Sequence, residues 1–488
     1  MHYLSIWLSE HGLTLSASKS KAVIFTRKRT IPDLEIRYED QIIQMDSSAK
    51  FLGVIFDSKL TGSQHFSYIA EKSEKGVNII RALSGVWWGS HPYCQKLLYN
   101  ALIRSHFDYG SFIFEPCNKE GLEKLNLVQT KCLRIIVGAM KSSPNAALMV
   151  ECVDPPLDLR RQYLSDWYVS KLIQVSSHPL LPYLDSLSHK VNIDNYWVNK
   201  DPPRLVRSYR RCKALPQPIS QSPAPPIFNC SFDALIFKPN VLLDLGISKN
   251  DREANRKLYQ VLGEKWMGWT IIFTDASRLT TNGNVGSAVW IPKYNVVLLF
   301  KNPCQTSVFT GEAIAIHEAV QYAKSHSLTK ILILSDSKSC LQAISGNIFK
   351  SSSNSSQIII NIKEALHYCC VNNFEIALAW IPGHSGISGN EQADLWAKEA
   401  VQSGLPTYSS IYCSDILPLA KTYLFRMWSR RWNELTKGKH YRNIQPDIPC
   451  KPWFFKFKHI SNKRTTSVLC RLRLGHVCTP VFLNKIRV

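Results

Sequence analysis

Two short apolar runs, each ended by an aspartate, limit the fold of this chain more than any other feature of its sequence. The runs are WTIIFT at 269–274 and ILILS at 331–335, and Asp275 and Asp336 follow them directly. Apolar runs of this length are typical of strands that are buried on both faces of an α/β sheet. Open α/β sheets place their ligands at the carboxyl ends of such strands. If the two strands are neighbours, the two aspartates meet at one edge of the sheet.

Two further carboxylates lie on predicted helices of the same stretch. Helical periodicity over 308–324 places Glu312 on the apolar face, in line with apolar residues four, seven, eight and eleven positions later. A charged group on a core-facing side must be paired or bind a metal. Asp394 lies in the first turn of another predicted helix, which follows the Gly-rich loop at 383–389 and which Asn390 is expected to cap.

Each of these carboxylates also has an ordinary structural explanation. Asp336 could cap a helix, Asp275 could end a strand in a turn, and Asp394 could complement a helix dipole. Glu312 is harder to explain in this way, because a glutamate is rarely fully buried without a partner. As a set, four carboxylates suit Mg²⁺ or Mn²⁺, whereas zinc would need Cys or His in place of some of them.

Residues 268–404 resemble a type 1 ribonuclease H domain. FTDAS, the helix that carries Glu312, LSDSKSCLQAI and WIPGHSGISGNEQAD follow that family's order and approximate spacing. The resemblance implies a metal-dependent endonuclease that hydrolyses the RNA strand of RNA–DNA hybrids with two Mg²⁺ ions, for which Mn²⁺ is a possible substitute. It implies four metal ligands, which are Asp275, Glu312, Asp336 and Asp394. It also implies a fifth catalytic residue, the loop histidine His384, which assists protonation or product release.

The same resemblance implies an α/β fold, a mixed five-stranded sheet with helices on both faces. Strands are expected near 269–275, 285–291, 295–301, 330–335 and 374–380, and helices near 308–325, 337–346, 354–372 and 390–403. One difference from the family lies beside the glutamate, where Gly311-Glu312-Ala313 replaces the usual Ala-Glu-Leu. A histidine alone in a loop is more often a surface residue than a catalyst, so the role of His384 depends on the motif around it.

The net charge of +22 is unevenly distributed along the chain. Residues 268–404 hold nine Lys and Arg and nine acids, whereas 405–488 hold sixteen Lys and Arg and three acids. This basic tail interleaves aromatic residues, a composition that can neutralise phosphates and stack on unpaired bases. The alternative is a helix over 421–435 whose aromatic residues pack inward, since they recur at helical spacing.

The spacing of the cysteines and the lengths of the apolar runs predict where in the cell the protein is found. The fourteen cysteines include no Cys-x-x-Cys pair, and we find no secretory leader. Reduced thiols are therefore expected, in an intracellular protein of the cytoplasm or nucleus that is not secreted. No run of 18 apolar residues occurs, so no membrane span is expected.

The N-terminal part resembles a fragment of a non-LTR retrotransposon reverse transcriptase. HGLTLSASKSKAVIFTRKR and AKFLGVIFDSKL are similar to the last part of the palm, and the helical stretch that contains LNLVQTKCLRIIVGAM is similar to the thumb. That family's polymerase centre includes an aromatic-x-Asp-Asp turn, and this chain has no Asp-Asp dipeptide. We therefore expect a truncated polymerase core that lacks the catalytic residues of DNA synthesis.

These observations predict five parts. A palm remnant occupies 1–60, a helical thumb-like region 61–200, a Pro-rich linker and lead-in 201–267, the ribonuclease H domain 268–404, and the basic aromatic tail 405–488. The linker prediction depends on seven prolines in 201–226, a composition that favours an extended segment.

Two functions from different classes fit this organisation. The first is an active ribonuclease H encoded by a retrotransposon fragment, with an RNA–DNA hybrid as substrate and nucleic acid bound through the tail. The second is a catalytically decayed retroelement product that only binds nucleic acid. A transposase or integrase of related fold fits less well, because its site has three carboxylates and lacks the Gly-His-Ser-Gly loop.

Overall fold

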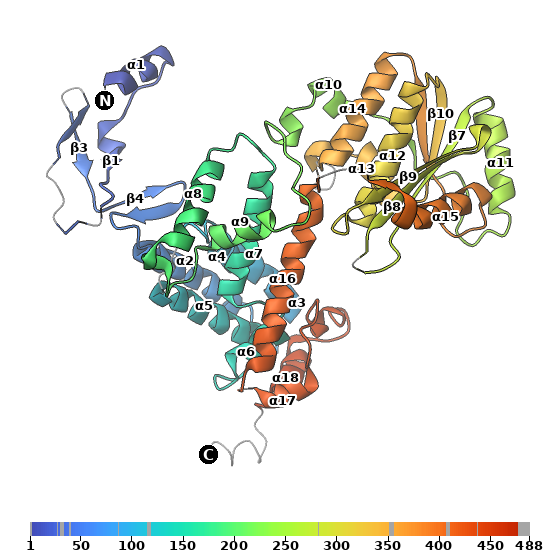
Figure 1. Cartoon of the computed structure of the whole chain (residues 1–488). Coiled ribbons are helices and arrows are strands. Elements are labelled where there is room, and N and C mark those ends of the chain that lie inside the picture. The colour runs from blue at the N-terminus through green and yellow to red at the C-terminus, as the bar shows by residue number, and fades with distance from the viewer. Residues whose placement is uncertain are drawn as a thin grey trace. The chain divides into compact units, whose positions relative to one another are not determined.

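The computed structural model describes residues 2–26, 28–29, 34–38, 41–85, 87–114, 119–281, 283–350, 356–406, 410–436 and 438–476. The chain divides into two compact units, each assembled from separate segments (Figure 1). Unit 1 comprises 1–165, 195–205 and 421–488, and unit 2 comprises 166–194 and 206–420. These units are cut differently from the five predicted parts, because the segment after 420 packs with the N-terminal half of the chain.

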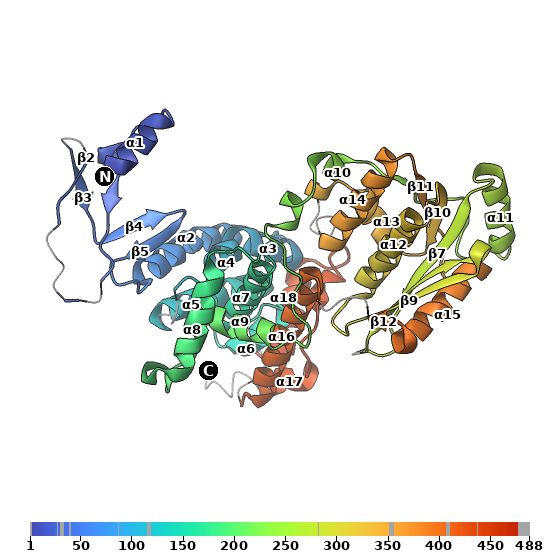
Figure 2. The ribbon, with the colours of Figure 1, turned by 45° about the horizontal axis from the view of Figure 1, so that its top comes forward.

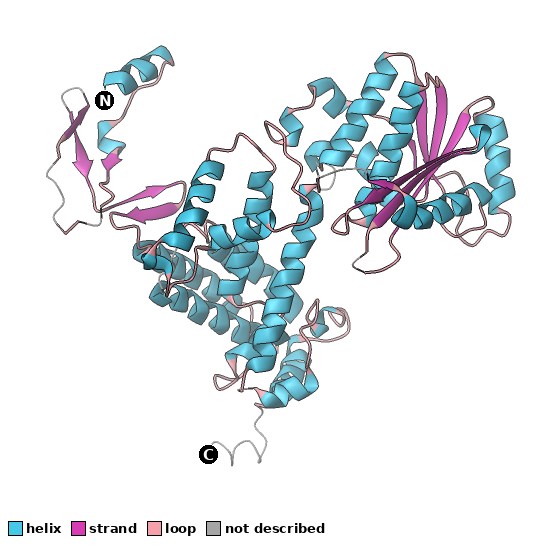
Figure 3. Ribbon diagram, in the orientation of Figure 1, coloured by secondary structure: helices cyan, strands magenta, loops and turns pink. Residues whose placement is uncertain are grey.

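Unit 2 is organised around a seven-stranded mixed sheet in the order β12-β9-β8-β7-β10-β11-β6. Figure 3 draws its strands in magenta and the helices around them in cyan. Its strands are β6 (Asn240–Leu242), β7 (Thr270–Ser277), β8 (Val285–Ile291), β9 (Val296–Asn302), β10 (Lys330–Ser335), β11 (Glu375–Trp380) and β12 (Leu405–Pro406). The pairs β7–β8 and β8–β9 are antiparallel, whereas β10 runs parallel to both β7 and β11. All five strands predicted from the sequence are present, and two short edge strands, β6 and β12, extend the sheet.

Helices cover both faces of this sheet, as predicted (Figure 2). They are α11 (Ala254–Lys265), α12 (Val308–Ser325), α13 (Lys338–Ser345), α14 (Gln357–Val371) and α15 (Ser388–Ser403). Alternate residues of a strand point to opposite faces. Ile272 and Ile333 therefore join the core with α12, α13 and α14, whereas Phe273 and Leu334 join the core with α11 and α15.

The stretch predicted as a linker contains regular structure. Helix α9 (Arg204–Lys213) follows Pro202 and Pro203, and Val206 and Tyr209 on it are buried. The prediction of an extended segment is wrong for this helix, because both prolines precede it and neither interrupts its hydrogen bonds. Unit 2 also contains α8 (Leu180–Ile193), α10 (Phe232–Ile236), the end of α7 (Leu157–Ile173) and the start of α16 (Cys413–Glu434).

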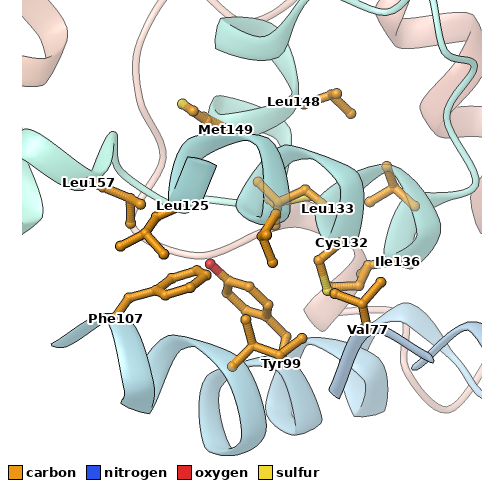
Figure 4. Packing of buried hydrophobic residues seen from close by; sticks show 14 of the residues in the cluster. Val77, Tyr99, Phe107, Leu125, Cys132, Leu133, Ile136, Leu148, Met149 and Leu157 are labelled. Atoms are coloured by element: carbon orange, nitrogen blue, oxygen red, sulfur yellow. The ribbon is translucent and has the colours of Figure 1, made fainter. Parts of the chain in front are cut away.

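Unit 1 is mostly helical. Its helices are α1 (His2–Glu10), α2 (Ser63–Ala82), α3 (Pro92–Tyr99), α4 (Ser105–Asp108), α5 (Lys119–Val137), α6 (Asn145–Glu151), α17 (Lys439–Ile444) and α18 (Lys463–Leu474), with parts of α7 (Leu157–Ile173) and α16 (Cys413–Glu434). Short strands lie between α1 and α2 in the sequence, namely β1 (Lys21–Ala22), β2 (Ile36–Tyr38), β3 (Gln41–Met45), β4 (Ser48–Phe51) and β5 (Val54–Asp57). Its core includes Val77, Tyr99 and Leu133 (Figure 4).

The aromatic residues of the C-terminal segment complete this core. Trp428 and Trp432 of α16, together with Tyr441 and Phe454, are at most 3% exposed and belong to the same cluster as α2 and α5. The inward-packed alternative for 421–435 therefore describes the structure, and these side chains are not available to stack on bases. No helix in the described part of the chain is long and apolar enough to cross a membrane.

Candidate active site

The register of two parallel strands places Asp275 and Asp336 side by side. Ser335 at the end of β10 is paired with Thr274 of β7. The residue that follows each member of this pair is an aspartate, Asp336 after Ser335 and Asp275 after Thr274. Asp275 is still within β7 and is 6% exposed. The Asp275 Oδ1 atom accepts a hydrogen bond from the Ala276 amide at 2.7 Å. The Asp336 carbonyl accepts one from the Trp380 indole at 3.0 Å, which ties the end of β10 to β11.

Helix α12 brings Glu312 to the two aspartates. Its N-cap is Ser307, whose hydroxyl accepts a hydrogen bond from the Thr310 amide at 3.1 Å. A side chain at Gly311 would lie 2.6 Å from Val285 Cγ1 and 3.0 Å from the Ala276 Cβ, so the first turn of α12 packs directly on β7 and β8. The glycine that departs from the family pattern is thus explained by this close approach.

Asp275, Glu312 and Asp336 form one acidic cluster. Each offers a carboxylate oxygen, and these three atoms all lie within 4.8 Å of one another. Burial raises the pKa of Asp275 to about 7, and the nearby Asp336 adds to the shift. Burial also raises the pKa of Glu312 well above its usual range, with a further contribution from the charges of Asp275 and Asp336. Three ionised carboxylates this close repel one another unless a cation lies among them.

The residues of the cluster fit a divalent cation. Glu312 is 5% exposed, and its Oε2 atom is buried without a hydrogen-bond partner among the described residues. An unpartnered buried carboxylate oxygen is costly, and a metal ion would satisfy it. The donors are all carboxylate oxygens, which are the ligands that Mg²⁺ and Mn²⁺ prefer. The cluster is therefore suited to hard cations.

Asp394 lies near this cluster but outside the three-residue group. Its carboxylate is bonded to Lys398 Nζ at 2.6 Å, one turn along α15, and its charge contributes to the raised pKa values of Asp275 and Asp336. Helix α15 begins at Ser388, so Asp394 is in the second turn and not in the first. The sequence reading placed the start of this helix two residues too late.

Asn390 does not cap α15, which corrects a second detail of the sequence reading. The cap comes from α11, where Asn255 Oδ1 accepts hydrogen bonds from the Ser388 amide at 3.1 Å and the Ser388 hydroxyl at 3.2 Å. Asn390 is instead inside the helix and 3% exposed. It donates a side-chain hydrogen bond to Asp336, which lowers the pKa of that carboxyl against the larger opposite effect of burial. Helix α15 therefore supports Asp336 from the face of the sheet opposite to α12.

His384 lies on the loop between β11 and α15. It is exposed and has a φ of 52°, in the left-handed region that few non-glycine residues adopt. Burial raises the pKa of Asp336, and the electrostatic interaction with His384 opposes this rise, so the two side chains are close enough to interact. A Cβ at the preceding residue, Gly383, would lie 2.4 Å from Asp336 Oδ2. The loop backbone can approach Asp336 only because that residue is glycine.

The sequence reading missed Asp415, which holds the start of α12. Asp415 is 3% exposed, and its Oδ1 atom accepts hydrogen bonds from the Ser307 amide at 3.1 Å and the Thr310 hydroxyl at 2.7 Å. Burial raises the pKa of this carboxyl to about 6. No local pattern indicates this role, because Asp415 lies 108 residues after Ser307 and at the start of a different helix.

The comparisons agree with this fold. The RNase H family model matches residues 268–402, and this part of the chain is an RNase H domain. The chain is also similar to two Drosophila melanogaster proteins. The "Probable RNA-directed DNA polymerase from transposon X-element" is 27% identical over 139 residues, which cover 28% of this chain and 15% of that protein. The "RNA-directed DNA polymerase from mobile element jockey" is 25% identical over 208 residues, which cover 42% of this chain and 21% of that protein.

These findings define one RNase H domain, at residues 268–402, in a chain that is similar over part of its length to two polymerases of mobile elements. The matched parts span about a fifth or less of the two relatives. What those longer proteins do as a whole therefore bears on this chain only as a proposal.

Proposed function

We propose that this chain is a metal-dependent endonuclease that hydrolyses the RNA strand of RNA–DNA hybrids. The observation that carries the proposal is the acidic cluster of Asp275, Glu312 and Asp336, held within 4.8 Å in a matched RNase H domain. The unpartnered Glu312 Oε2 atom and the raised pKa values support a cation at this point. Two bound Mg²⁺ ions would activate a water and stabilise the leaving oxygen of the cleaved phosphodiester.

The residues of the chain divide the remaining work. Asp275 and Asp336, at the ends of adjacent strands, would hold the metal ions from the sheet, and Glu312 would hold them from α12. Asp394 would complete the set from α15 by exchanging its contact with Lys398, 2.6 Å away, for a metal ion. His384, exposed on a glycine-flanked loop, would move a proton at the leaving oxygen or assist product release.

The test is cleavage of a labelled RNA–DNA hybrid by the purified full chain. We expect cleavage with Mg²⁺ or Mn²⁺, none in EDTA, and none of duplex DNA, because only ribose offers the 2′-hydroxyl that distinguishes RNA. Asp275→Asn should abolish cleavage. The matched control is Asp233→Asn on α10, an exposed aspartate of unit 2 that undergoes the same change of charge and size.

The competing proposal is a product that has lost activity and only binds nucleic acid. It predicts hybrid binding without cleavage by the parent chain in either metal. Cleavage that persists unchanged in Asp275→Asn would point to a contaminating nuclease, and the assignment of this site would be wrong.

A further inference from the structure

Unit 1 contains a groove lined by basic residues, whereas the acidic cluster of Asp275, Glu312 and Asp336 belongs to unit 2. The groove encloses about 630 Å³ and is lined by residues of α2, α5, the turn after α5, and α18. Five of the lining residues are cationic, and none is acidic: Arg81, Lys131, Arg134, Lys141 and Arg471. A groove of this composition attracts polyanions.

Most of this charge is not neutralised by the protein. Within the described residues, Lys131 pairs with Glu74 at 2.7 Å, whereas Arg81, Lys141 and Arg471 have no ion-pair partner. Charges in a shared groove repel one another, so a bound anion would stabilise the folded unit as well as the complex.

Arg134, which also lines the groove, has a donor without an acceptor. Its guanidinium donates to the Ser143 carbonyl at 3.3 Å and to the Asn145 side chain, but its Nε atom is buried without a partner among the described residues. A buried N–H without an acceptor is unfavourable, so a shift of the Arg134 side chain that brings this donor to a phosphate oxygen would be favourable.

Gly138, in the turn after α5, allows helix α18 to pack closely against this turn. The Arg471 Nε atom donates to the Gly138 carbonyl at 2.6 Å, and Gly138 has a φ of 62°. A Cβ at Gly138 would lie 2.5 Å from Ser467 Oγ on α18. The close approach of α18 to the turn after α5 therefore fixes Arg471 at the wall of the groove.

An exposed aromatic platform continues from the same elements. Ser84 lies two residues after the end of α2 and lines the groove, and the same loop carries Trp87 and Trp88, which are 77% and 71% exposed. The Arg464 guanidinium lies over the Trp87 ring, 3.9 Å from its centroid. Arg464 and Arg471 are both on α18, two turns apart, which corresponds to about 10 Å along the helix.

We infer that this groove and loop form a binding site for a single-stranded nucleic acid. The cations would follow the phosphates, and Trp87, backed by Arg464, would offer an open ring on which a base can stack. A phosphate groove combined with exposed aromatic rings is the arrangement that single-strand binding proteins use. This site needs no metal ion and no hydrolysis, so it is independent of the nuclease function proposed above.

The test measures binding of labelled 12-nucleotide single strands, one of RNA and one of DNA, to the full chain in EDTA by fluorescence anisotropy. The first variant is Arg81→Gln with Lys141→Gln. Its matched control is Lys238→Gln with Lys249→Gln, which removes the same charge from exposed positions of unit 2. Loss of two phosphate contacts should weaken binding on the order of 50-fold at 50 mM salt and flatten the salt slope by about 1.4. The control should do neither.

A second variant, Trp87→Ala, separates stacking from charge. Removing one base-stacking ring should weaken binding roughly 5- to 150-fold without changing the salt slope. Because Trp87 is 77% exposed, its loss should leave the melting temperature unchanged. The variant should weaken RNA and DNA binding by the same factor, because stacking on Trp87 does not require the ribose hydroxyl.

Three results would overturn the inference. Equal weakening by the Lys238 and Lys249 control would show that net charge alone attracts the strand. Unchanged affinity of Trp87→Ala would remove the stacking platform. Equal affinity for blunt duplex DNA, or full competition by inorganic polyphosphate of the same charge, would reduce the groove to a general anion site.

Discussion

Removing one charge from the acidic cluster should stabilise the metal-free protein, and only at neutral or alkaline pH. The pKa of Asp275 is raised from 3.8 to about 7, so the folded protein binds this proton more tightly than the unfolded chain does. The resulting stability is complete below about pH 4 and is lost as the pH rises through about 7. Asp275→Asn cannot titrate, so the variant should escape this loss.

The size of the effect follows from the shift. A change of roughly three pKa units corresponds to roughly 4 kcal/mol of unfolding free energy. Because the three carboxylates titrate together, one residue accounts for only part of it, and we expect about 2 kcal/mol. For a domain of 150–250 residues, this raises the melting temperature by about 4–8 °C.

The assay is thermal unfolding in EDTA at pH 8 and pH 4.5, with Asp233→Asn as the control. The variant should melt above the parent at pH 8, and most of this difference should disappear at pH 4.5. Addition of Mg²⁺ at pH 8 should stabilise the parent more than the variant, because a cation relieves the same repulsion. If the variant melted below the parent at pH 8, or if the difference did not depend on pH, the carboxylates would not be repelling one another.

Three further substitutions test how the site is supported. Gly383→Ala places a Cβ 2.4 Å from Asp336 Oδ2, so the Asp336 carboxylate must move by roughly 1 Å, and kcat should fall by at least about tenfold. The control is Gly386→Ala, where a Cβ would meet nothing within 4 Å and only the strain of the positive φ is tested. His384→Ala should reduce kcat on the order of 10²-fold or less and remain measurably active, unlike Asp275→Asn; equal loss in both would give His384 a larger role. Asp415→Asn should raise the Mg²⁺ concentration needed for half-maximal cleavage, since it loosens the first turn of α12; unchanged metal dependence would separate Asp415 from Glu312.

The fold of the RNase H domain could be read from the sequence because its signals are local. Apolar runs such as ILILS define β10 and its neighbours, and helical periodicity defines α12, so the five main strands and four helices match their predicted ranges closely. The edge strands β6 and β12 could not be read in this way. Each has three residues or fewer, and its assignment depends on a partner strand that is distant in sequence.

The support of the site was less predictable than its carboxylates. Asp275 and Asp336 each follow a recognisable strand, and the register of those strands decides that they meet. Asn255 and Asp415, by contrast, act on helices to which they are not adjacent in sequence. Both lie outside residues 268–402, so the part of the chain that holds the site in place is larger than the part that matches the family.

The C-terminal segment shows why charge and aromatic content have to be separated before its role can be tested. Its sequence suggests that cations and aromatic rings bind nucleic acid together, yet Trp428 and Trp432 are buried in the core of unit 1. Deleting 405–488 would therefore expose that core and weaken binding by unfolding, whatever the tail does. Substituting exposed cations one pair at a time leaves the core intact, because the charged ends of such side chains lie in solvent. Trp87, which lies against Arg464 of α18, is 77% exposed, whereas Phe457 of the tail is 44% exposed, so Trp87 is the better position at which to test stacking.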